Sequence, residues 1–202
     1  SIALKIFMGF LAVYFMFSFL ILGIALYPML QELFPNQKPM ATLNNFVAIW
    51  IVMEVFMRFM IQSLPVMNIK PLMVNNIKQS IFSFYNILAP LAIIPFGIWC
   101  ITKGDYSAVQ VIAWIIAMLS LVLVINYSNF LIKKKFAENI KGFLPYVALV
   151  LVLIGLEYFE VFNISEFVGG IMSFMVENPY LAVVPLLIAI GLYYWNFAYL
   201  KS

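Results

Sequence analysis

The stretch IFMGFLAVYFMFSFLILGIALYPMLQ, residues 6–31, runs for 26 residues without a charged side chain. Five more apolar stretches follow it, at residues 43–63, 79–102, 106–132, 143–163 and 178–200. A helix needs about 20 apolar residues to cross the hydrocarbon core of a bilayer, which is about 30 Å thick. The sequence therefore predicts an all-α, polytopic membrane protein with six transmembrane helices and the lipid bilayer as its surroundings.

The composition supports this class and excludes several others. Hydrophobic residues make up 66% of the chain and charged residues 9%, whereas soluble domains carry roughly 25% charged residues. The net charge of +3 is small and dispersed, so no nucleic-acid partner is predicted. With no histidine and one cysteine, the chain cannot supply a metal hydrolase site or a Ser-His or Cys-His nucleophile. The sequence predicts no catalytic residue, no metal and no cofactor, and thus a protein that is not an enzyme.

Turn residues and lysines divide the apolar stretches into helices. The six predicted spans are residues 3–30, 43–63, 79–102, 107–132, 142–162 and 179–200. Tyr27 and Pro28 are expected to end the first span. All six belong to one transmembrane domain, residues 1–202. Because a span begins almost at Ser1 and no Met precedes it, we expect this chain to be a fragment of a longer one.

Lysine and arginine concentrate in cytoplasmic loops, which sets the orientation. With both termini inside, nine of the eleven basic residues fall on the cytoplasmic side, and only Lys38 and Lys103 fall outside. Most acidic residues take the outer side, namely Glu32, Asp105, Glu160, Glu166 and Glu177. The sequence therefore predicts six crossings with the N- and C-termini in the cytoplasm.

The cytoplasmic connection 63–78 is longer than a turn requires. Apolar residues recur in it at spacings of three and four, at Val66, Ile69, Met73 and Ile77. Pro71 suits the first position of a short helix. The pattern predicts an amphipathic helix at the membrane surface. Two interpretations remain open: a segment resting on lipid headgroups, or a helix that docks into a soluble partner.

The outer connection 163–178 is too short to cross the membrane and too apolar for a free loop. Apolar segments of this length are typical of re-entrant or interfacial structure. The preferred interpretation is a re-entrant hairpin of two short helices, in which Gly169 and Gly170 supply the reversal and Glu166 lies at the entry. The alternative is a simple interfacial helix.

Polar and helix-breaking residues inside the spans are the other candidates for function. Glu54 and Arg58 stand four residues apart in the second span, and charges within spans mark functional candidates. They are predicted to form an intramembrane ion pair that sets packing and depth, with a role in substrate binding or gating as the alternative. Arg58 could also snorkel to the cytoplasmic surface instead of pairing with Glu54. The prolines Pro90, Pro95 and Pro185 are expected to interrupt their helices. They are candidate hinges, with the alternative that proline is simply frequent in membrane helices.

The local sequence also carries a resemblance. The segments RFMIQSLP (58–65), IKP (69–71), IK (77–78) and SFYN (83–86) resemble an uncharacterised bacterial permease-like family paired with ABC ATPases. The layout of six spans, a cytoplasmic amphipathic segment and an outer re-entrant element is similar to the permease fold of type-2 ABC exporters.

The resemblance implies several features that the residues alone do not. It implies an ABC-type ATPase subunit as partner, a second permease half or a homodimer partner, and a location in the bacterial inner membrane. Members of the family are about twice this length, which would make this chain one half. Its coupling segment would comprise Pro65, Lys70, Pro71, Asn75, Asn76 and Lys78. The outer cap would comprise Glu166, Gly169 and Gly170.

The expected function is therefore the permease half of an ATP-driven exporter, coupled to a separate ATPase through residues 65–78. One alternative is a non-transporting membrane subunit that anchors or scaffolds a larger complex. A further alternative is an ion-coupled secondary carrier, which would require Glu54 to titrate while facing a cavity.

Overall fold

The computed structural model describes residues 1–61, 84–138 and 143–201, and every element in these ranges is helical. The helices are α1 (Ile2–Leu33), α2 (Pro39–Ile61), α4 (Phe84–Lys103), α5 (Ala108–Glu138), α6 (Phe143–Tyr158), α7 (Ile164–Glu177), the 3-10 helix η3 (Pro179–Ala182) and α8 (Val183–Lys201). The all-α prediction is confirmed for the described residues. The predicted amphipathic helix within 63–78 lies outside them.

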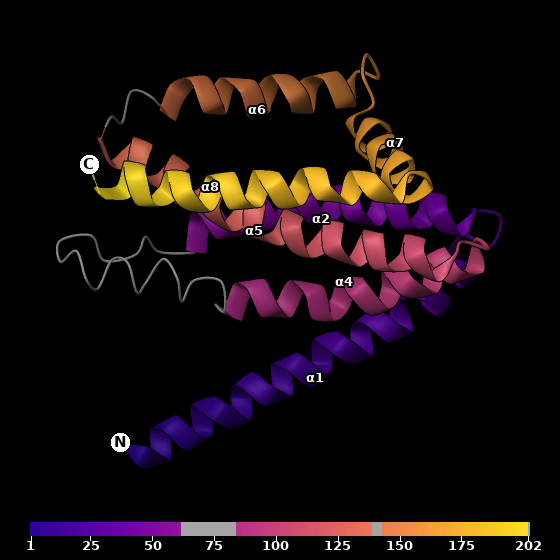
Figure 1. The fold of residues 1–202 in the computed structure, drawn as a ribbon, viewed down its shortest axis with the longest axis horizontal. Helices are drawn as coiled ribbons and strands as arrows, with labels where there is room; N and C mark the ends of the chain where they lie inside the picture. The colour runs from indigo at the N-terminus through magenta and orange to yellow at the C-terminus, as the bar shows by residue number, and fades with distance from the viewer. Residues whose placement is uncertain (62–83, 139–142, 202) are drawn as a thin grey trace.

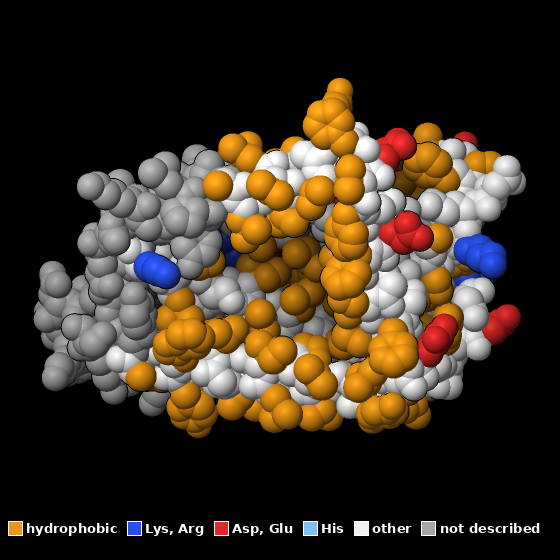
Figure 2. All heavy atoms as spheres, turned by 90° about the horizontal axis from the view of Figure 1, so that it is seen from above, with side chains coloured by type: hydrophobic (Ala, Val, Ile, Leu, Met, Phe, Trp, Pro, Cys, Tyr) orange, Lys and Arg blue, Asp and Glu red, His pale blue; other side chains and the backbone are white. Residues whose placement is uncertain are grey.

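Four stretches in these ranges are long and apolar enough to cross a membrane, namely Ile2–Leu33, Asn86–Lys103, Ala108–Lys133 and Pro179–Ala198. Shorter apolar stretches, Pro39–Val55 and Ala148–Tyr158, lie in α2 and α6. These helices indicate a membrane protein. Side chains around the middle of the molecule are largely hydrophobic, and most visible Asp and Glu side chains gather at one end (Figure 2).

The long helices run back and forth along one axis, and both termini lie at the same end of the molecule (Figure 1). The principal packed pairs are α1 with α4, α5 with α8, and α2 with α7, while α4 packs on both α2 and α5. α6 runs beside the bundle and packs closely on none of the other described elements. Its residues 148–154 are exposed on every side.

The main core lies between α1, α2, α4 and α5. Tyr27 of α1 stacks on Trp99 of α4 with ring centroids 5.1 Å apart, and Phe46 of α2 meets Phe96 of α4 edge-on at 4.8 Å. Glycine permits a close approach of α1 to α4, because a Cβ at Gly23 would lie 2.2 Å from the carbonyl oxygen of Ala92. α1 is therefore held by its second half, and no residue before Gly23 is buried in the described part of the chain.

Local sequence signals set several helix ends. Ser107 and Gln110 form a capping box at the start of α5, in which the Ser107 N–H donates to Gln110 Oε1 at 2.8 Å and the Gln110 N–H donates to Ser107 Oγ at 3.4 Å. The Asn163 side chain accepts a bond from the Glu166 N–H at 3.0 Å and caps α7.

Proline interrupts these helices less than predicted. Pro28 lies inside α1, which continues to Leu33 rather than ending at Tyr27 and Pro28. The predicted interruptions at Pro90 and Pro95 are also wrong, because α4 is continuous through both. Pro185 is the third residue of α8, where the backbone N–H has no intrahelical partner to lose, so the predicted break is absent there. Neighbouring helices can satisfy the carbonyls that proline frees inside a membrane helix.

The predicted hairpin of two short helices at 163–178 is wrong. α7 is one continuous helix of 14 residues, and both Gly169 and Gly170 lie in its middle. It is amphipathic: Gly169, Met172 and Val176 are buried against the bundle, whereas Glu166 and Gly170 are exposed. The element is a single helix, as in the alternative interpretation, and it packs on α2 and α5.

Candidate functional site

α2 places Glu54 and Arg58 on one face, one helical turn apart. Arg58 Nε donates to Glu54 Oε1 at 2.6 Å, which is a charge-assisted hydrogen bond. The Arg58 side chain is only 1% exposed and that of Glu54 is 17% exposed. Arg58 therefore does not reach the surface by snorkelling, and Glu54 and Arg58 form the predicted ion pair.

α5 supplies amides that complete the surroundings of Arg58. Arg58 Nη1 donates to Asn126 Oδ1 at 3.2 Å, and Asn129 Nδ2 donates to the backbone carbonyl oxygen of Arg58 at 3.4 Å. Both asparagines are buried, Asn126 completely. They stand three residues apart and so share one face of α5. The charge pair on α2 is thus bonded to α5 through both side chain and backbone.

α8 adds one more buried amide, Asn196, which the sequence reasoning missed. Its side chain is fully buried. Asn196 Nδ2 donates to the carbonyl oxygen of Tyr127 on α5 at 3.2 Å and to that of Leu192 on its own helix at 2.8 Å. The sequence did hold a signal, because Asn196 is the only amide side chain among the residues of α8.

We name this group the polar cluster; it comprises Glu54, Arg58, Asn126, Asn129 and Asn196. Its one formal anion and one formal cation neutralise each other, so it carries no net charge for an ionic ligand to balance. Burying two charges is tolerated when they are paired and their remaining hydrogen-bonding groups find partners. The arrangement suits holding three helices in register better than binding an ion or transferring a proton.

A second polar contact lies at the opposite end of α2. Asn44 Nδ2 donates to Ser173 Oγ of α7 at 2.5 Å. A Cβ at Gly169 would lie 2.8 Å from Asn44 Cβ, whereas one at Gly170 would meet nothing within 4 Å. Gly169 therefore allows close approach of α7 to α2, rather than the reversal predicted for it.

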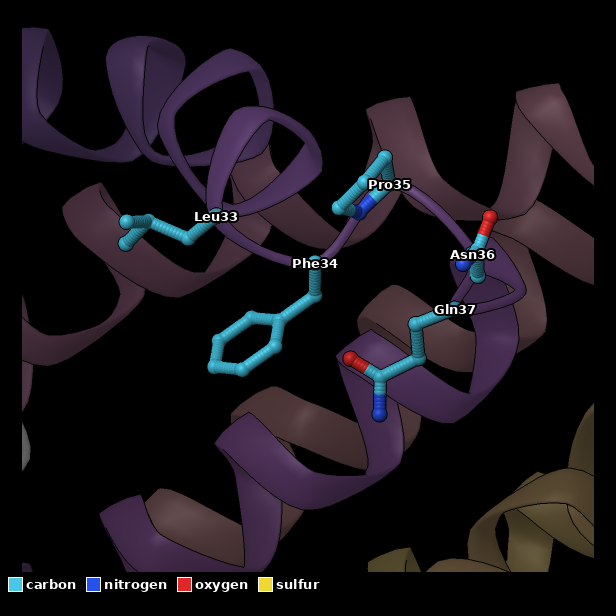
Figure 3. A pocket seen from close by; sticks show the side chains of 5 residues that line it. All are labelled: Leu33, Phe34, Pro35, Asn36 and Gln37. Carbon is cyan, nitrogen blue, oxygen red and sulfur yellow. The ribbon is translucent and has the colours of Figure 1, made fainter.

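The pocket drawn in Figure 3 is a surface depression in the turn between α1 and α2. Its lining residues are Leu33, Phe34, Pro35, Asn36 and Gln37. These five consecutive residues carry no charge, and the depression is far more open than a ligand cavity. It holds no group that could act as an acid, a base or a nucleophile.

The other predicted site residues lie outside this cluster. The coupling residues Pro65, Lys70, Pro71, Asn75, Asn76 and Lys78 fall in 62–83, beyond the described residues. Arg58 is four residues before that segment. Among the described residues, no group of three His, Cys, Asp or Glu side chains could hold a metal ion. The structure thus brings Glu54 and Arg58 together and leaves Pro90, Pro95 and Pro185 apart from them in α4 and α8.

Comparison with known proteins gives a family and no function. No curated protein and no solved structure matches the chain significantly. One family does match, described as a family of unknown function (DUF5687), and the match covers residues 1–202. Since that match extends over the whole sequence, the chain belongs to the DUF5687 family.

Proposed function

We propose that the protein is the permease half of an ATP-driven exporter in a bacterial inner membrane. A separate ABC-type ATPase drives it through residues 65–78, and a second half, either another copy of the chain or a related one, completes the transport path. The observation that carries the proposal is the polar cluster. It bonds α2 to α5 and α5 to α8, starting seven residues before the segment to which the ATPase would bind.

In this proposal all six long helices cross the membrane, with both termini in the cytoplasm. α2 has 23 residues and is about 34 Å long at 1.5 Å per residue, enough for the hydrocarbon core. α6 is shorter, with 16 residues, and crosses where the bilayer thins or together with the residues that precede it. The alternating course of the helices and the acidic side chains at one end agree with this orientation.

A second half is part of the proposal because one chain leaves much helix surface uncovered. α6 packs closely on none of the described elements, and the first half of α1 has no buried residue among them. The path therefore lies between two halves.

The test is purification of the chain from its native host, with the partner identified and its ATPase activity measured in liposomes. Lys70→Glu combined with Lys78→Glu is expected to abolish stimulation of the ATPase by the chain, because both charges lie on the docking segment. Lys103→Glu is the matched control, since Lys103 is exposed, is the last residue of α4 and does not belong to the docking segment. Undiminished stimulation in the double variant would refute docking through residues 65–78.

A second candidate function is a non-transporting membrane anchor or scaffold. The observation in its favour is the tight aromatic packing between α1, α2 and α4, where Tyr27 stacks on Trp99 and Phe46 meets Phe96. A scaffold would bind its partner without changing the partner's ATPase rate. The same purified complex separates the two: stimulated hydrolysis supports the permease, and a stable but unstimulated complex supports the scaffold.

A further inference from the structure

Three helices that are distant in the sequence are joined by hydrogen bonds near one end of the bundle. Arg58 of α2 donates to Asn126 of α5, Asn129 of α5 donates to the backbone of Arg58, and Asn196 of α8 donates to the backbone of Tyr127 in α5. Two of these three bonds end on a backbone carbonyl. They therefore fix the main chain of one helix against its neighbour, not only a side chain.

The surroundings make these bonds hard to exchange. Asn126 and Asn196 are completely buried, and Arg58 nearly so. Aromatic residues of α5 and α8 enclose the bond of Asn196, with Tyr127 and Tyr193 meeting edge-on at 5.5 Å. In such an environment no water replaces a broken hydrogen bond, so a sliding movement between the helices would leave polar groups unsatisfied.

The described parts of α1 and α6 are joined to the bundle differently. α6 packs closely on none of the described elements, and α1 packs on α4 through its second half. Apolar helix surfaces that share no hydrogen bond can slide or separate at a lower free-energy cost than hydrogen-bonded ones, since lipid tails are as apolar as the helices.

We propose that α2, α5 and α8 move as one rigid unit, and that Asn196 is a positioning residue that carries a displacement of the end of α2 to α8. The role in transport rests on the proposed function, in which the ATPase displaces residues 65–78 and hence α2. The rigidity itself does not depend on that function. Without the bond from Asn196, α2 and α5 would move and α8 would lag behind them.

Spin-label distances in the full chain in liposomes test the rigidity. Labels replace the exposed residues Met57 on α2, Ala198 on α8 and Leu151 on α6, in a Cys100→Ala background. We expect a narrow distance distribution for Met57–Ala198 and a wider one for Met57–Leu151. Asn196→Leu should widen the first at least twofold, whereas Asn45→Leu, at an exposed position of α2, should leave it unchanged. A Met57–Ala198 distribution as wide as that of Met57–Leu151 would overturn the rigid unit, and this comparison needs no Asn196 variant to fold.

ATPase stimulation then tests the positioning role. Asn196→Leu is expected to lower stimulation by the chain about three- to tenfold, the effect of losing one interhelical hydrogen bond, while the affinity for the ATPase stays unchanged because residues 65–78 are intact. Asn196→Gln, which keeps the amide donor, should restore most of the stimulation. Full stimulation in Asn196→Leu would refute the positioning role. If the unaltered chain stimulates no ATPase, the proposed function fails, and the spin-label widths still decide whether the unit is rigid.

Discussion

Replacing Glu54 and Arg58 singly and then together should change the free energy of unfolding non-additively: the double variant should lose less stability than either single variant. Arg58→Leu removes the 2.6 Å bond to Glu54 and the 3.2 Å bond to Asn126. It leaves a carboxylate in an apolar setting, and breaking a buried pair in this way costs about 3–5 kcal/mol. Glu54→Leu leaves the guanidinium instead.

The two single variants should differ, because the two side chains differ in exposure and chemistry. The Glu54 side chain is 17% exposed, so its carboxylate is only partly buried when Arg58 is removed, whereas the guanidinium of Arg58 is 1% exposed and would stay almost wholly buried without its carboxylate. We therefore expect Glu54→Leu to be at least as destabilising as Arg58→Leu. The double variant contains neither charge and chiefly lacks the bond to Asn126, so its loss should be about 1–2 kcal/mol.

The assay is reversible unfolding of the purified chain in mixed micelles, with increasing sodium dodecyl sulfate and tryptophan fluorescence as the signal. The free energy of unfolding is compared for the unaltered chain, both single variants and the double variant. Lys103→Leu serves as control, because Lys103 is exposed, and should change the free energy of unfolding by less than about 0.5 kcal/mol. A double variant as unstable as either single one would refute the account of the pair as two mutually neutralising buried charges.

Three further predictions use residues whose neighbours differ sharply. Gly23→Ala should separate α1 from α4 and lower the unfolding midpoint, because the new Cβ would lie 2.2 Å from the Ala92 carbonyl oxygen. Gly9→Ala in the same helix meets nothing within 4 Å and should leave the midpoint unchanged. Equal midpoints for the two variants would contradict the close approach. Gly169→Ala should loosen α7 from α2 and speed proteolysis there by about threefold or more, while Gly170→Ala, which meets nothing, leaves the rate unchanged. Cys100 is 0% exposed, so a maleimide should label it only after denaturation, and rapid labelling of the folded chain would show that the core is open.

The sequence predicted the helices well because lipid imposes a simple rule. A run such as residues 6–31 has to be helical in a bilayer, whatever it packs on, since only helices and closed barrels satisfy the backbone there. Helix ends were less predictable. Pro28 was expected to end α1, yet α1 continues for five more residues, and Leu30 in this extension still packs against the main core.

The sequence pattern could not predict which residues of different helices contact one another. Gly169 and Gly170 look alike in sequence, and only the position of Asn44 shows that the first permits close approach and the second is exposed. Glu54 and Arg58 were found because charges stand out in an apolar span. Asn196 was overlooked because a single amide is unremarkable until its distance to the Tyr127 carbonyl oxygen is known.

The long unburied start of α1 bears on how this family's sequences can drift. Residues 2–22 contribute no buried side chain to the described fold, so we expect the fold of this chain to tolerate many apolar substitutions there. Within the family, residues 2–22 then need only to remain apolar, unless another molecule binds to that surface. Low sequence variability at these positions among orthologues would therefore indicate that such a partner exists.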